Sequence, residues 1–140
     1  MLYETPNPHG GDLYSREILL DFSANINPYG TPRAVKEAVA ASVENLRCYP
    51  DPYCRKLISA IADFEQVPAK QVFCGNGAAE LIFSCCMALR PRKAMVLSPC
   101  FSEYETALKV FGTETAHYLL RREDDFALTE AFLPTLERFD

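Results

Sequence analysis

The sequence predicts an α/β fold in which short strands alternate with helices. Two observations carry this prediction. From residue 69 onwards, short apolar segments alternate with longer segments whose apolar residues recur at helical spacing. Before residue 32, prolines and glycines interrupt the chain repeatedly, which is typical of an extended arm. At 140 residues, 49% of them hydrophobic, the chain is long enough to bury a core.

The first expected segment is an N-terminal arm at residues 1–31. Its apolar segment, EILLDFSA at 17–24, is expected to form one short strand between turns. The arm ends at Thr31, which can cap a helix, and Pro32 suits the first helical position. Two helices are therefore predicted within residues 32–68.

The first of these helices covers 33–46, where apolar residues form one stripe. Two prolines in RCYPDPY end it. The second helix covers 54–67, where CRKLISAIADFEQV repeats the same spacing.

Residues 69–140 are predicted to form a layered sheet with its helices. The expected elements are a strand at 71–74, a helix at 78–89, a strand at 93–98, a helix at 101–112, a strand at 113–120 and a helix at 129–139, interrupted or begun anew at Pro134. In such sheets, ligands bind beyond the carboxyl ends of strands. The glycine loop at 75–77 and the segment SPCFSEY both fall at such ends.

Charge and hydropathy exclude several classes of protein. The net charge is −5 and the basic residues are scattered, so no nucleic-acid partner is expected. The N-terminus is neither basic nor apolar enough for a signal peptide, and no apolar run is long enough to span a membrane. We therefore expect a cytoplasmic protein that has no membrane contact.

The six cysteines do not have the spacing of a metal site. No C-x-x-C occurs, and the only histidines are His9 and His117. Cys85 and Cys86 lie in an apolar stretch. We therefore expect no metal and no disulfide scaffold, and interpret the cysteines as reduced, small, buried apolar residues.

The stretch FCGNGAAELIF places Gly75, Asn76 and Gly77 between an apolar segment and a helix start. Glycines let the backbone turn sharply, and the free N–H groups of a helix amino end attract anions such as phosphate. The same pattern also suits a strand-to-helix turn that binds nothing. Both explanations stay open on this motif alone.

Five motifs, in this order, resemble the N-terminal part of fold-type I pyridoxal-phosphate enzymes. They are HGG at 9–11, LDFSANINPYG at 20–30, YPD at 49–51, GNGAAELIF at 75–83 and SPCFSEYETAL at 98–108. Within this superfamily the chain looks most like threonine-phosphate decarboxylases of cobalamin biosynthesis, whose near relatives are the histidinol-phosphate aminotransferases. The resemblance implies that 32–68 belongs to the small domain or dimer interface, and that 69–140 is an incomplete cofactor-binding large domain.

The resemblance also implies a site for pyridoxal 5′-phosphate. Backbone N–H groups of Ala78 and Ala79, just after Gly77, would bind the cofactor phosphate. Many relatives carry an acidic or hydroxyl residue where this chain has Ala79, so only the backbone contact is left here. Phe101 matches an aromatic that stacks on the pyridine ring, although an ordinary core residue would look the same. Tyr49 matches a tyrosine that reaches the neighbouring subunit's cofactor phosphate, or is simply a turn residue.

Three further residues resemble substrate-binding positions. Asn25 matches a substrate-contacting asparagine, and His9 with Gly10 matches an arm that closes over a substrate phosphate. An asparagine in a proline-rich segment can also be only a turn residue. The resemblance thus implies a small phosphorylated amino acid as substrate and a homodimer as the assembly.

Three functions remain open. A decarboxylase would release CO2 from L-threonine O-3-phosphate and yield (R)-1-amino-2-propanol O-phosphate, whereas an aminotransferase would remove the Cα proton. The third function is a non-catalytic module that binds a phosphate ligand or a partner. In the family, the lysine bonded to the cofactor lies beyond the matched region, and no lysine here has a Ser-x-x-Lys context. We therefore interpret the chain as an N-terminal fragment and predict that it is inactive alone.

Overall fold

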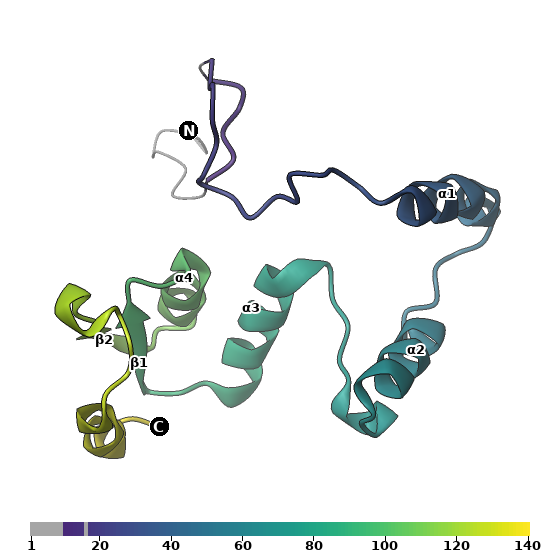
Figure 1. Ribbon diagram of the computed structural model, residues 1–140. Helices are drawn as coiled ribbons and strands as arrows, with labels where there is room; N and C mark the ends of the chain where they lie inside the picture. Colours follow the sequence, from purple (N-terminus) through teal and green to yellow (C-terminus); the bar gives the residue numbers. More distant parts are fainter. Residues whose placement is uncertain (1–9, 16) are drawn as a thin grey trace. The chain divides into compact units, whose positions relative to one another are not determined.

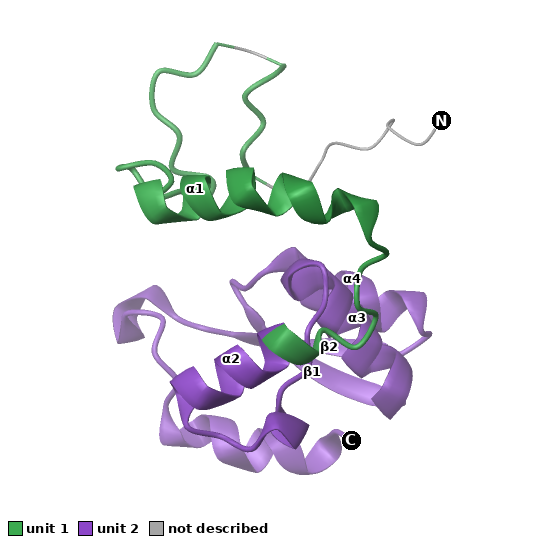
Figure 2. Ribbon diagram, turned by 90° about the vertical axis from the view of Figure 1, so that its right-hand side faces the viewer, with its two compact units in different colours: residues 1–56 green, residues 57–140 purple. Residues whose placement is uncertain are grey.

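The computed structural model describes residues 10–15 and 17–140. The chain divides into two compact units, residues 1–56 and residues 57–140, which Figure 2 shows in different colours. Figure 1 labels the helices and strands.

Unit 1 contains the N-terminal arm and the first helical segment of the chain. The described part of 17–24 contains no strand, so the prediction of a short strand there is wrong. Polar side chains fold the arm into bends instead: the Gly11 N–H donates to Ser23 Oγ at 2.8 Å, and Ser23 Oγ donates to the Asp21 carboxylate at 2.5 Å. The Ser23 N–H also donates to the Asp21 carboxylate, at 2.8 Å, and such side-chain bonds to the backbone compete with strand pairing.

The first predicted helix is confirmed, with a different beginning and end. Helix α1 spans Arg33–Ser42 and continues as a 3-10 helix at Val43–Arg47. Pro32 has φ −55° and ψ 146°, so it is the N-cap residue and not the first helical residue, and no side chain caps the helix. The prediction that Thr31 caps this helix is therefore wrong.

The second predicted helix is also confirmed. Helix α2 spans Arg55–Glu65 and crosses the boundary between the units. Its amino end is capped by Asp51, whose carboxylate accepts from the N–H groups of Arg55 at 3.0 Å and Tyr53 at 3.1 Å. These bonds lower the pKa of Asp51, with the Arg55 bond contributing most.

The prediction of a strand at 71–74 is wrong, because this segment is not part of a strand. The segment begins within a 3-10 helix at Ala69–Gln71, and Val72 is extended, with φ −106° and ψ 127°. Extended backbone becomes a strand only when a neighbouring strand bonds to it. Neither of the two described strands pairs with this segment.

The remaining elements of unit 2 form a β-α-β unit. Two parallel strands, β1 at Lys93–Ser98 and β2 at Glu114–Leu119, are joined by helix α4 at Ser102–Val110 and preceded by helix α3 at Gly77–Leu89. The register pairs Lys93 with Glu114 at one end and Ser98 with Leu119 at the other. The predicted parallel α/β arrangement is confirmed (Figure 1).

The core of unit 2 lies where α4 packs on the sheet. Val96 of β1 and Ala107 and Leu108 of α4 are buried. Thr113 is also buried, and its hydroxyl donates to the Pro91 carbonyl at 2.8 Å. The prediction that the cysteines are buried is wrong, since the six thiols are exposed or of intermediate exposure. The two-stranded sheet leaves much of the helix surface uncovered.

The last segment is helical in a tighter form than predicted. After a 3-10 turn at Arg122–Asp124, a 3-10 helix spans Glu130–Arg138 and contains Pro134. Proline lacks the N–H that an α-helix would use at this position. Among the described residues, no helix is long and apolar enough to cross a membrane.

Candidate functional site

The glycine loop leads directly into the amino end of α3. Asn76 is the N-cap residue, and Gly77 begins the helix with φ +85°, a conformation that favours glycine. A Cβ on Gly75 would lie 2.8 Å from Leu81 Cδ2 and 3.2 Å from Glu80 Oε2, so the loop folds closely onto the first turn. A Cβ on Gly77 would meet nothing within 4 Å. The approach to this helix end is therefore open.

A carboxylate already lies at this helix end. Glu80 Oε2 accepts a hydrogen bond from the Asn76 N–H at 2.5 Å. A negative charge here interacts favourably with the helix dipole. Ala78 and Ala79, both exposed, belong to the first turn, whose N–H groups have no acceptor within the helix. A phosphate could use these two amides, with Glu80 as a neighbouring like charge.

Phe101 lies at the carboxyl side of β1, where it is the N-cap residue of α4. Its side chain is 46% exposed, and its ring meets the Tyr104 ring edge-on, with centroids 6.0 Å apart and an interplanar angle of 89°. A half-exposed aromatic ring can stack on a flat ligand. Figure 1 shows the amino end of α3 and the carboxyl end of β1 on the same, upper side of unit 2.

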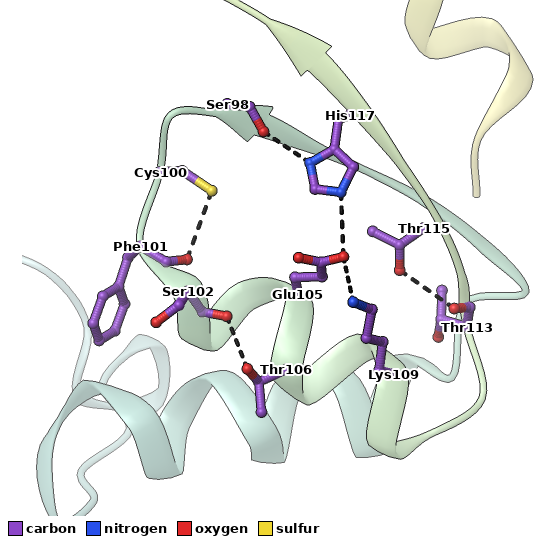
Figure 3. A network of polar contacts seen from close by, with 10 residues as sticks. All are labelled: Ser98, Cys100, Phe101, Ser102, Glu105, Thr106, Lys109, Thr113, Thr115 and His117. Carbon is purple, nitrogen blue, oxygen red and sulfur yellow. Dashed lines mark hydrogen bonds and ion pairs between the residues drawn. The ribbon is translucent and has the colours of Figure 1, made fainter. Parts of the chain in front are cut away.

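A polar network joins β1, β2 and α4 next to the turn that ends at Phe101, whose ring points away from the His117 imidazole (Figure 3). Ser98 Oγ, at the end of β1, lies 2.8 Å from His117 Nδ1 on β2. His117 Nε2 lies 3.2 Å from Glu105 Oε1 on α4, and Lys109 Nζ pairs with the same oxygen at 2.6 Å. The Lys109 hydrogen bond, followed by that of His117, lowers the pKa of Glu105. Glu105 is therefore a carboxylate at neutral pH.

The other predicted site residues belong to unit 1. Gly10 packs against the backbone of Ser23, and a Cβ on Gly10 would lie 1.9 Å from the Ser23 carbonyl oxygen. Asn25 is exposed and follows Ser23 by two residues, so the arm brings Gly10 close to the segment that carries Asn25. Tyr49 is 93% exposed after the first helical segment. His9 lies outside the described residues.

Comparison with known proteins identifies the family to which the chain belongs. A model of the family aminotransferase class I and II matches residues 17–138, so the chain belongs to this family. Its fold is part of fold-type I of the pyridoxal-phosphate enzymes, as the resemblance implied. Enzymes of this family use pyridoxal phosphate.

Individual relatives show which enzymes of the family this chain is similar to. The chain is 41% identical over 136 residues to threonine-phosphate decarboxylase of Salmonella typhimurium, covering 91% of this chain and 37% of that protein. It is 29% identical over 126 residues to histidinol-phosphate aminotransferase of Anoxybacillus flavithermus, covering 89% of this chain and 33% of the relative.

Solved structures match as well. The histidinol-phosphate aminotransferase of Clostridium acetobutylicum matches with a TM-score of 0.74 and 28% identity, over 87% of this chain and 36% of that one. The L-threonine-O-3-phosphate decarboxylase of Porphyromonas gingivalis matches with a TM-score of 0.65 and 20% identity, over 76% and 33% of the two chains, which supports the fold alone. The chain thus spans about a third of the length of these relatives.

The residues of unit 2 fit the family's cofactor. The first turn of α3 is exposed, and the open Gly77 position leaves room for a phosphate beside the amides of Ala78 and Ala79. Phe101 is 46% exposed, so a flat ring can contact it. Glu80 is the one feature that opposes an anion at this place, because its carboxylate occupies the neighbouring Asn76 N–H.

Sequence reasoning missed several residues that shape the surroundings of the predicted site residues, in unit 1 and in unit 2 separately. Glu80 carried a visible signal, since an acidic residue in the first turn commonly caps a helix. Asp21 and Ser23 lie in a pattern typical of side-chain-to-backbone turns. The Ser98, His117 and Glu105 network carried no signal in the sequence, because its members are far apart along the chain and meet only through the parallel pairing of the strands.

Proposed function

We propose that this chain forms the N-terminal part of a pyridoxal-phosphate enzyme that decarboxylates L-threonine O-3-phosphate to (R)-1-amino-2-propanol O-phosphate. The observation that carries the proposal is the 41% identity to a threonine-phosphate decarboxylase over 91% of this chain. A second relative, a putative threonine-phosphate decarboxylase of Caldanaerobacter subterraneus, is 39% identical over 90% of the chain and supports the same substrate.

Residues of unit 2 would bind and orient the cofactor. The N–H groups of Ala78 and Ala79 would donate to its phosphate, since the exposed first turn of α3 offers them to an anion. The Phe101 ring would cover one face of the pyridine ring and exclude water from it. When bound, the cofactor supplies the electron sink that takes up the electrons of the breaking bond.

Residues of unit 1 would act on the substrate and across a dimer. Gly10, close to Ser23, would place the arm over the substrate phosphate together with His9, and Asn25 would contact the substrate. Tyr49 is 93% exposed and free to donate its hydroxyl to the cofactor phosphate of a neighbouring subunit. A homodimer would thus complete each site.

An aminotransferase acting on histidinol phosphate is the alternative. It is favoured by the higher TM-score of the Clostridium acetobutylicum structure, 0.74 against 0.65 for the decarboxylase structure. Both reactions begin with a phosphorylated amine substrate. They differ in the bond to Cα that breaks, which is the bond to the carboxylate or the bond to hydrogen.

Product analysis separates the two reactions. The full-length protein that contains this chain is incubated with pyridoxal phosphate and 2-oxoglutarate, in one reaction with L-threonine O-3-phosphate and in a second reaction with histidinol phosphate. We expect CO2 and 1-amino-2-propanol O-phosphate in equal amounts and no glutamate. Glutamate formed from histidinol phosphate without CO2 would support the alternative, and no turnover of either substrate would contradict both. The 140-residue chain alone should release no CO2 above the rate of the free cofactor.

A further inference from the structure

We propose that His117 is a positioning residue that fixes Phe101 for contact with the cofactor ring. The inference rests on the proposed function, because Phe101 has this role only in a cofactor-binding protein. His117 lies in the middle of β2 and matches none of the motifs that pointed to the family. Its role follows from the network in Figure 3.

The network encloses the turn that carries Phe101. This turn consists of residues 99–101, between the end of β1 at Ser98 and the start of α4 at Ser102. Ser98 bonds to His117 on one side of the turn, at 2.8 Å. Glu105, one helical turn after Phe101, bonds to the same imidazole on the other side, at 3.2 Å. His117 therefore links Ser98, the residue before the turn, to Glu105 in the first part of α4 after it.

The imidazole can keep both contacts in either protonation state. In the neutral ring, Nε2–H donates to the Glu105 carboxylate while Nδ1 accepts from the Ser98 hydroxyl. In the protonated ring both nitrogens donate, and the Ser98 oxygen accepts. Lys109 holds Glu105 through a second contact at 2.6 Å, which restricts the rotamers available to the carboxylate.

The same strands carry a matched control at their other end. Lys93 and Glu114 are paired in the register, and their side chains form an ion pair at 3.2 Å. This pair joins β1 to β2 as His117 does, but at the amino ends of the strands, away from Phe101. Glu114→Ala removes one polar link between the strands without touching the turn.

A double-mutant cycle on cofactor affinity tests the inference. Pyridoxal-phosphate binding to the full-length protein is titrated by absorbance for wild type, His117→Ala, Phe101→Ala and the double variant. We expect His117→Ala to raise the dissociation constant several-fold, up to about tenfold, and to have no further effect when Phe101 is already alanine. Ser98→Ala, a smaller change, should show the same coupling, and Glu114→Ala should leave the affinity unchanged.

Two kinds of result would overturn the inference. The first contradicts only the positioning role of His117, and the second contradicts the ring contact of Phe101 itself. If Phe101→Ala weakens binding but His117→Ala and Ser98→Ala have no effect, or act equally in both backgrounds, the positioning role is wrong and the proposed function stands. If the wild-type protein does not bind the cofactor, or if Phe101→Ala leaves its affinity unchanged, the proposed ring contact fails and the inference fails with it.

Discussion

At the scale of single residues, Gly10 shows two separate constraints on one position. Its resemblance to the substrate-closing arm predicted a functional glycine, and the structure adds a steric reason. A Cβ at this position would lie 1.9 Å from the Ser23 carbonyl oxygen, and no rearrangement of a flexible side chain can relieve a clash with backbone. The sequence motif identified the glycine, but the clash depends on a fold of the arm that the motif does not specify.

Gly10→Ala should therefore displace the arm and break the hydrogen bond from the Gly11 N–H to Ser23 Oγ. Amide hydrogen exchange by NMR should show faster exchange at Gly11, as Ser23→Ala should also do. Gly30→Ala is the control: Gly30 has a positive φ, +74°, which Gly10 does not, but a Cβ on Gly30 would meet nothing within 4 Å, so this variant strains the backbone without the clash. Unchanged exchange at Gly11 in Gly10→Ala would contradict the close approach.

At the scale of secondary-structure elements, helices were predicted more reliably than strands. Helices depend on local sequence patterns, whereas strands also depend on a pairing partner. Helices α1 to α4 were predicted to within a few residues of their ends, because helical periodicity and turn residues are local. The strand at 93–98 was predicted with the same bounds, since a short apolar run between turns marks it. The segments 17–24 and 71–74 have the apolar character of strands, but a strand also requires a partner, which no local pattern contains.

The stabilisation that the contact between α4 and β2 contributes should depend on pH, because Glu105 takes part in this contact. Hydrogen bonds from Lys109 and, to a smaller extent, His117 lower the pKa of Glu105 in the folded protein below its ordinary value of 4.5. The stabilisation is therefore fully present above pH 4.5 and is lost as the pH falls through the lower folded-state pKa. Thermal unfolding from pH 7 to pH 3 should show a smaller loss of Tm for Glu105→Gln than for wild type, from a lower starting value. Parallel curves for the two proteins would contradict this account.

At the scale of the whole chain, the family and the general arrangement could be predicted, and the interpretation as a fragment also predicts exposed apolar helix faces, but not which side chains are exposed. In unit 2, β1, β2 and α4 form a small core, while several large apolar side chains stay more than half exposed. They include Phe64, Phe73, Met87, Leu89, Val110 and Leu119. Apolar patches of this kind on a protein surface mark contact surfaces. Their extent follows from how many strands and helices cover one another, which the sequence pattern of one segment does not state.

The 140-residue chain in isolation should therefore associate. Sedimentation velocity should show species larger than the 15.7 kDa chain, in amounts that rise with concentration, and 1-anilinonaphthalene-8-sulfonate fluorescence should increase on binding. The control is the full-length protein, in which we expect less dye bound per chain. A monodisperse monomer of the isolated chain that binds no dye would contradict the prediction.

The central claim is that this chain carries the phosphate and ring contacts of a pyridoxal-phosphate site, at the first turn of α3 and at Phe101. The most direct test is to titrate the full-length protein, freed of cofactor, with pyridoxal phosphate and, in parallel, with pyridoxal, which lacks the phosphate. We expect saturable binding of pyridoxal phosphate and at least about tenfold weaker binding of pyridoxal, because charged hydrogen bonds to the helix amides would be lost. Equal affinity for the two compounds, or no saturable binding of either, would contradict it.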